Sequence, residues 1–420
     1  MPPRALPFVV LWACLAPAAA QQFRGAGGCS GASCHGRTSA APEAQSRIPA
    51  NEYSVWAVRD KHANAYKALA DDRSRRMAET LKLGPAERAP RCLSCHAAGS
   101  PPDQISDGVS CEGCHSAGPT VAKWLGPHSA AGVTHAANVA NGMYDTKDLT
   151  LRAKKCLECH IGTADKVVDH ELIAAGHPDL VFELDTFGAA QPAHWRPPKP
   201  QAGNSLPGVR EWAVGQAVAL GEGMRLLAAR TATSWPEFAE LECYQCHHDL
   251  RAESWRIQRG YGGRKPGSLQ ANLARQEVLR ILAAQAAKEQ AGALDGALRQ
   301  LATVIATRLG DGAGIAKAAQ AAAGQADALA ARFAKQDFDS GTARALVKAL
   351  SGDAARLAGS GVQTAEQATM ALDALGAAAW PGNQGFQALI AKLYDYLEHP
   401  SAYQPAEFAG LFRKAAALLN

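Results

Sequence analysis

Four times along this chain, two cysteines separated by two residues are followed directly by a histidine. These C-x-x-C-H motifs are Cys92, Cys95 and His96; Cys111, Cys114 and His115; Cys156, Cys159 and His160; and Cys243, Cys246 and His247. A fifth pair, Cys29 and Cys34, also ends in a histidine, His35, although four residues separate its cysteines. Histidine is rare in this chain, so its chance occurrence after all five pairs has a probability on the order of 10⁻⁸.

Three kinds of chemistry use paired cysteines in this way. Five disulfides would suit an exported protein, and C-x-x-C units would suit tetrahedral zinc. Neither requires a histidine directly after every pair. Covalent haem c does require it, because two thiols form thioethers to the porphyrin and the next residue supplies an imidazole to the iron. The sequence therefore predicts haem c at the four regular motifs.

The longer spacer of the first pair leaves two possibilities. Cys29 and Cys34 are the only cysteines left in the mature chain once the four motifs are assigned. Two extra residues can loop out without moving His35 from its place beside Cys34, and Gly31 suits such a bulge. A short disulfide between the two cysteines is the alternative. We predict a fifth haem here, which gives five covalently bound haems in all.

A haem iron with histidine on both faces needs a second imidazole from elsewhere in the chain. Eight histidines lie outside the motifs, and seven of them fall between residues 62 and 248. Five stand in settings that suit a distal ligand: His62, His128, His170, His177 and His194. The candidates His135 and His248 are weaker, because His248 adjoins the proximal His247 and must point elsewhere. Met77, Met143 and Met224 are better explained as helix-filling residues.

Two of these histidine settings predict helices. Val55, Val58, His62, Tyr66 and Leu69 recur at helical spacing, so we expect His62 to lie on one continuous helix face. His170 and His177 are seven residues apart, which is two helical turns, so one helix would carry both on the same side.

The first 20 residues have the layout of a secretory signal peptide. Arg4 precedes an apolar run over residues 6–15, and small residues lead to an expected cleavage after Ala20. A lipoprotein anchor at Cys14 is disfavoured by the adjoining Trp12 and the short apolar run. No later stretch reaches the roughly 18 apolar residues that a membrane helix needs. We expect an exported, periplasmic protein without a membrane span.

The charge gives no reason to expect nucleic acid or an anionic membrane as partner. The formal net charge is +4, and haem propionates would make the loaded protein slightly negative.

The distribution of cysteine and histidine predicts two domains after the signal peptide at residues 1–20. Residues 21–257 hold all the motifs, residues 258–268 read as a Gly-rich linker without a phosphate-loop pattern, and residues 269–420 contain no cysteine. The last part is rich in alanine with apolar residues at three- and four-residue spacing. We therefore predict an all-α fold: a multihaem cytochrome c domain with little regular sheet, followed by an Ala-rich antiparallel bundle of about five helices.

Three local signals refine the helices. Residues 207–232 read as one long helix. Ser234 to Glu237 and Thr364 to Gln367 both match a capping box, so a helix should start at each, the first leading into the fifth motif.

The motifs and their neighbours resemble a known family. In order, CSGASCHG, DKHANAY, CLSCH, DGVSCEGCH, KWLGPH, CLECH, DHELIAAGHPDLVFELDTF, PAHW and ECYQCHHDL resemble exported multihaem c-type cytochromes related to cytochrome c-554, over residues 25–255. The resemblance implies an α-helical fold around closely packed haems, some stacked in parallel pairs, and periplasmic electron transfer. It also supports the five chosen distal histidines. Better-known relatives carry four haems, one of them without a second protein ligand, whereas this chain has five motifs.

Two functions follow as hypotheses. The first is a carrier that exchanges electrons with redox partner proteins through mostly bis-histidine haems. The second is a multihaem enzyme in which one open iron acts on a nitrogen or sulfur oxyanion or on nitric oxide. The C-terminal bundle would serve dimerisation or docking, or would support the haem domain.

Overall fold

The computed structural model of this protein describes residues 23–46, 48–117, 122–196, 205–247, 251–254 and 265–419. These residues form α-helices and short 3-10 helices, with two isolated β-bridges and no strand among them, which confirms the all-α prediction. None of the described helices is both long and apolar enough to cross a membrane. The predicted signal peptide with Cys14, residues 258–264 of the predicted linker, and His248 lie outside the described residues.

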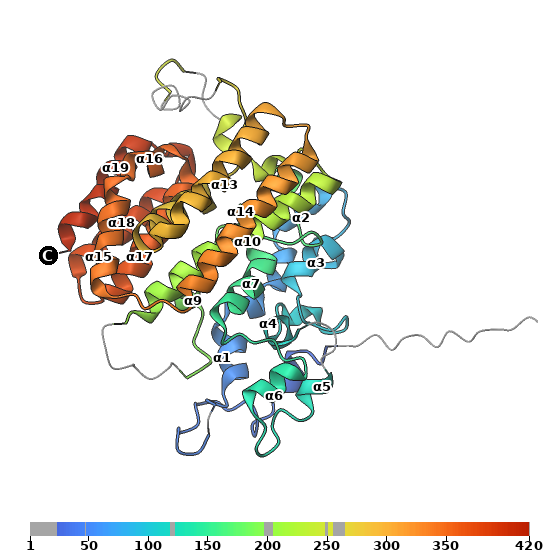
Figure 1. Ribbon diagram of the computed structural model, residues 1–420. Coiled ribbons are helices and arrows are strands. Elements are labelled where there is room, and N and C mark those ends of the chain that lie inside the picture. The colour runs from blue at the N-terminus through green and yellow to red at the C-terminus, as the bar shows by residue number, and fades with distance from the viewer. Residues whose placement is uncertain are drawn as a thin grey trace, which may run out of the picture.

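The first part of the chain consists of short helices joined by long loops (Figure 1). They are α1 (Glu52–Arg59), α2 (Asp72–Thr80), α3 (Pro90–His96), α4 (Cys111–His115), α5 (Ala122–Leu125), α6 (His135–Ala140), α7 (Leu149–His160), α8 (His170–Ala174) and α9 (Leu184–Ala190). Several of them, such as α1 and α3, bury no residue completely. A small core of Leu69, Ala78 and Ala86 lies beneath α2. Side chains in this region therefore surround the motifs and build no large apolar core of their own.

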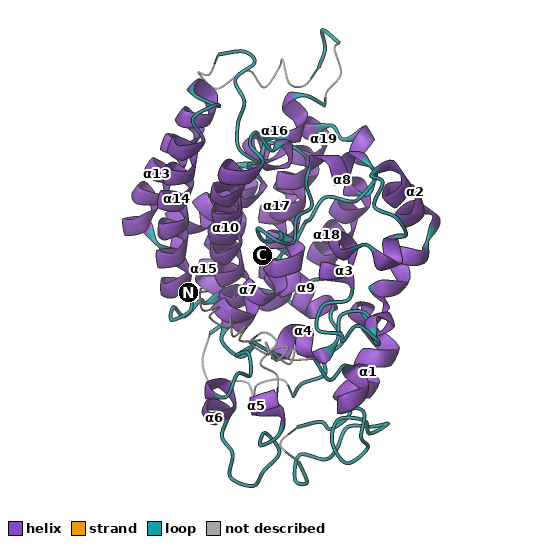
Figure 2. Cartoon of the chain, turned by 90° about the vertical axis from the view of Figure 1, so that its right-hand side faces the viewer, coloured by secondary structure: helices purple, strands orange, loops and turns teal. Residues whose placement is uncertain are grey.

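The second part is a bundle of longer helices (Figure 2). They are α10 (Pro207–Thr233), α12 (Ala274–Ala286), α13 (Lys288–Thr307), α14 (Gly312–Phe333), α15 (Ser340–Gly352), α16 (Ala354–Gly359), α17 (Val362–Ala379), α18 (Gln384–Leu397) and α19 (Pro405–Phe412). The described chain after residue 269 thus has eight α-helices, more than the five predicted. The periodic runs are interrupted at Asp353 and at Gly361, whose φ of 113° breaks the helix before α17.

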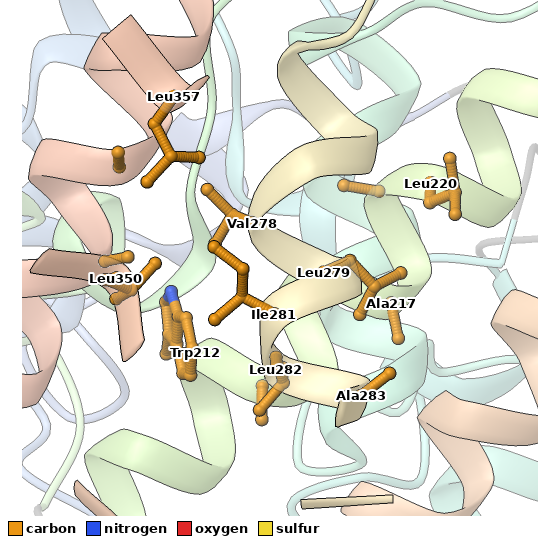
Figure 3. Packing of buried hydrophobic residues seen from close by; sticks show 14 of the residues in the cluster. Trp212, Ala217, Leu220, Val278, Leu279, Ile281, Leu282, Ala283, Leu350 and Leu357 are labelled. Carbon is orange, nitrogen blue, oxygen red and sulfur yellow. The ribbon is translucent and has the colours of Figure 1, made fainter. Parts of the chain in front are cut away.

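Helix α10 joins the two parts. It packs most extensively on α14 and also contacts α7, the helix that ends in the fourth motif. The resulting core is continuous from Ala153 to Leu419, and Trp212 of α10 is completely buried within it, beside Leu282 and Leu350 (Figure 3). The division into two domains near residues 258–268 stays a prediction, but the fourth motif rests on the same core as the bundle.

Both predicted capping boxes are wrong. Ser234 follows the last residue of α10, and Glu237 instead caps a 3-10 turn by accepting the Ala239 N–H. No α-helix leads into the fifth motif. Thr364 lies inside α17, which starts two residues earlier, directly after Gly361. In both cases the helix boundary lies at another residue than the local capping pattern indicates.

Candidate cofactor sites

Three of the five motifs end an α-helix. His96, His115 and His160 are the last residues of α3, α4 and α7. On a helix, residues separated by three and four positions share a face, so the two cysteines and the histidine of each motif point the same way. A planar group tethered to both thiols would therefore face the imidazole.

The first motif forms a tight turn. The Cys34 N–H donates to the Gly31 carbonyl at 2.8 Å, and the Gly36 N–H donates to the same oxygen at 3.0 Å. A Cβ on Gly36 would lie 1.9 Å from the Ser30 oxygen, so only glycine fits directly after His35. The two extra residues of the spacer are absorbed in this turn.

Each motif histidine lies near one of the five predicted distal histidines. We number the sites by motif: site 1 has His35 and His128, site 2 His96 and His177, site 3 His115 and His194, site 4 His160 and His62, and site 5 His247 and His170. The ring centroids are 6.2 Å apart in site 1, 6.3 Å in sites 3 and 4, and 6.0 Å in site 5.

This spacing fits two imidazoles on opposite faces of one metal ion. An imidazole nitrogen lies about 2 Å from a bound metal and the ring centre about 1 Å further out, so the two centroids should be about 6 Å apart. The residues of sites 1, 3, 4 and 5 therefore fit an iron held by histidine on both faces.

Six of these rings use Nδ1 for a hydrogen bond to an oxygen. The acceptors are Glu52 for His35, Asp60 for His62, and main-chain carbonyls for His96, His128, His177 and His194. When Nδ1 carries the proton, Nε2 is left free to bind a metal. His135 is different, because its Nε2 contacts Asp145 at 2.9 Å.

Two motif imidazoles are desolvated enough to stay neutral. Burial lowers the pKa of His115 to about 4, and it lowers the pKa of His160 to about 4 as well. Phe182 and Phe187 both pack against the His160 ring. The neutral ring is the form that binds iron, so these two residues need no deprotonation at neutral pH.

Site 2 brings His96 and His177 together. Burial lowers the pKa of His177, and the nearby His96 lowers it further. The two histidines predicted for this site are therefore neighbours in the folded chain.

Cysteines of different sites lie next to one another. A hydrogen bond between the thiols of Cys29 and Cys111 raises the pKa of Cys111. A second hydrogen bond, between the thiols of Cys95 and Cys159, raises the pKa of Cys159. Burial raises the pKa of Cys114 to about 12, and the neighbouring Cys156 adds to this. Sites 1 and 3, 3 and 4, and 4 and 2 are therefore adjacent.

Ion pairs connect site 5 to the rest of the molecule. Arg91, directly before Cys92, pairs with Asp169 at 2.5 Å, directly before His170. Glu237 accepts the His170 N–H at 2.9 Å and pairs with the buried Arg230 of α10 at 3.6 Å. Site 5 is thus held between the site 2 helix and the bundle.

Two predicted helices are not formed as expected. The helix before His62 ends at Arg59, because the buried Asp60 accepts the His62 N–H at 2.9 Å and starts a 3-10 turn. Val58 is consequently 80 % exposed. Helix α8 ends at Ala174, and Gly176, with φ of 121°, turns the chain so that His170 and His177 serve different sites.

Several supporting residues were not predicted. Glu52 and Asp60 bind ring nitrogens of His35 and His62, and Gln363 of α17 lies within 4.0 Å of the Cys243 sulfur. Asp60 stands two residues before a candidate ligand, a spacing that allows this capping contact. Glu52 and Gln363 gave no such signal, because the residues that they contact are distant in sequence.

The comparisons with known proteins identify one family. Residues 28–116 match the family model described as cytochrome c554 and c-prime. This segment contains the first three motifs and His62. No curated protein and no solved structure matches the chain.

Proposed function

We propose that this chain, a c-type cytochrome related to the cytochrome c-554 family through residues 28–116, is a periplasmic electron carrier with five covalently bound haems. One observation carries the proposal: every motif histidine lies near a separate distal histidine, and four of the five pairs have centroids 6.0–6.3 Å apart.

The protein side chains have two tasks in this function. The ten motif cysteines would anchor the groups, and the five motif histidines with their five partner histidines would hold the iron, so that no ligand need be exchanged when the redox state changes. The bound haems supply reversible one-electron chemistry. Because the cysteines of sites 1, 3, 4 and 2 adjoin in that order, they would hold the groups close enough for stepwise transfer.

The direct test is to count the haems and measure their potentials. We expect intact mass and a pyridine haemochrome assay to give five haems per chain, and redox titration to give the low to moderate potentials that two nitrogen ligands favour. A product with the mass of bare protein would refute the proposal. Potentials that all lie in the range of histidine–methionine cytochromes would refute the ligand assignment.

The loop position of His177 favours one second function. His177 directly follows Gly176, whose φ of 121° turns the chain, so it lies on a loop beyond the end of α8. An iron there with a displaceable face would bind nitric oxide or a nitrogen or sulfur oxyanion. A high-spin signal, or a spectral shift on adding nitric oxide or cyanide, would favour this enzyme over the carrier.

The angles between paired rings predict distinct spectra. The ring planes differ by 10° in site 1, but by 86° in site 4 and 87° in site 3. Parallel imidazoles split the iron d orbitals strongly and perpendicular ones leave them nearly degenerate. We expect electron paramagnetic resonance of the oxidised protein to show both rhombic and highly anisotropic low-spin signals. A single rhombic species would contradict these geometries.

The carboxylate beside His35 should lower the potential of site 1. Glu52 contacts the His35 Nδ1 at 3.0 Å, which raises the pKa of His35 and makes the ring a stronger donor to ferric iron. We expect Glu52→Gln to raise this potential by about 40 mV, the equivalent of about 1 kcal/mol for one electron. Glu43→Gln removes the same charge from an exposed position nine residues earlier in the chain and is the control. An equal shift in both variants would show that only long-range charge matters.

A further inference from the structure

A stretch of the chain with an excess of basic residues lies over site 2. Residues 59–91 contain nine Lys and Arg against five Asp and Glu, an excess equal to the formal charge of +4 of the whole chain. We call this stretch the basic segment. Its exposed cations are Arg59, Lys61, Lys67, Arg73, Arg75, Arg76, Lys82 and Arg88.

The acidic residues of the segment are partly withdrawn from its surface. Asp60 is 2 % exposed and turned toward His62. Glu87 is half-buried, whereas Asp71, Asp72 and Glu79 remain exposed among the cations. The surface that results is positive with interspersed negative charges.

The basic segment is fixed to the cysteine side of site 2. Leu69, Ala78 and Ala86 form its small core, and Cys92 and Leu93 of the second motif pack against that core. This small core therefore joins the basic segment, with its exposed cations, to the helix that carries the site 2 cysteines.

Helix α2 also holds the distal loop of site 2. Arg73 Nε donates to the Gly176 carbonyl at 2.7 Å, directly before His177. Met77 packs on the same glycine, since a Cβ built there would lie 3.6 Å from its Cγ. Figure 2 shows α2 at the outer edge of the molecule. An object docked on α2 would therefore rest directly above both halves of site 2.

We propose that the basic segment is the docking surface for an acidic redox partner protein that exchanges electrons at site 2. Complementary charge speeds encounter and fixes orientation, and it matters most close to the redox group. The mixture of cations with Asp71, Asp72 and Glu79 suits the patterned charge of a protein surface better than the uniform phosphates of nucleic acid or lipid. This inference rests on the proposed electron-transfer function.

The charge of the basic segment can be tested with small charged oxidants, so the partner protein need not be known. In each reaction one ferrous haem gives one electron to hexacyanoferrate(III), which becomes hexacyanoferrate(II), or to tris(phenanthroline)cobalt(III), which becomes cobalt(II). We expect the double variant Arg75→Glu and Arg76→Glu to be oxidised roughly three- to tenfold more slowly by the anionic hexacyanoferrate(III) and faster by the cationic cobalt complex. Both changes in rate should disappear at 1 M salt. Lys317→Glu with Lys335→Glu makes the same charge change at exposed positions of the bundle and should leave both rates unchanged.

Binding assays separate the classes of partner. Poly-L-glutamate should bind the native protein and not the Arg75/Arg76 variant. Vesicles of phosphatidylglycerol and a single-stranded oligonucleotide should bind both proteins equally weakly. Loss of vesicle or oligonucleotide binding in the variant would overturn the proposal in favour of those partners, and unchanged oxidation rates would overturn it outright. Failure of the electron-transfer function would look different, because the protein would then lack its haems.

Discussion

Replacing Cys29 and Cys34 together by alanine should remove one haem and leave four. The two cysteines flank a hydrogen-bonded turn that keeps His35 beside Cys34, and the His35 ring lies 6.2 Å from His128. Without thiols the motif has no covalent attachment, so a fifth of the haem absorbance should be lost and the mass should fall by one haem. Intact mass spectrometry and a pyridine haemochrome assay measure both.

The control leaves both thiols in place. Ser33 contacts the Cys34 sulfur at 3.7 Å, so Ser33→Ala changes the same turn without removing an attachment point. It should keep all five haems. If the cysteine variant also keeps its full haem content, the first motif is not an attachment site. A native mass that is two hydrogens short, with four haems, would indicate the disulfide instead.

Replacing Trp212 by alanine should destabilise the whole protein. Trp212 of α10 is completely buried in the core of the bundle, in the same cluster as Leu282 and Leu350 (Figure 3). Truncating a buried tryptophan costs about 3–5 kcal/mol, a large share of the stability of an ordinary domain. Denaturant unfolding followed by far-ultraviolet circular dichroism measures the loss. Val58→Ala is the control, because Val58 is 80 % exposed and its truncation should cost little.

Two further measurements use the same position. The Trp212 indole N–H is buried without a hydrogen-bond partner, so Trp212→Phe should cost much less than the alanine variant. In Trp212→Ala, the shift of the haem absorbance and the loss of helical signal should occur at the same denaturant concentration, because α7 of site 4 shares the core with the bundle. Separate transitions would instead support two independent domains.

The sequence predicted which histidines lie close together better than it predicted the helices that carry them. The motif spacing is local, so the cysteine and histidine sets are readable directly, and the structure brings every chosen distal histidine near a motif histidine. The sequence did not show which motif histidine each of them pairs with, because partners such as His62 and His160 are 98 positions apart in the chain. Such contacts depend on packing that no local pattern records.

The errors in the helices have a common physical cause. The prediction of a helix over residues 207–232 matches the bounds of α10 to within one residue. At Asp60 and Gly176, however, one capping contact and one positive φ end or redirect a helix that periodicity would continue. At Ser234 the local capping pattern predicted a new helix, but the residue is the C-cap of α10. The charge over site 2 was also missed, because the summed formal charge of the chain hides a local excess.

The pairing of histidines means that no short segment of this chain contains a complete proposed site. Residues 28–116 carry three of the motifs, but the histidines that lie opposite their motif histidines, His128, His177 and His194, all come later in the chain, while His62 lies beside His160. A fragment that ended at residue 116 would therefore hold three motifs without their second histidines. In the proposed assignment, the smallest fragment with both histidines of sites 1, 3 and 4 runs from Cys29 to His194, so a shorter fragment cannot reproduce all three sites.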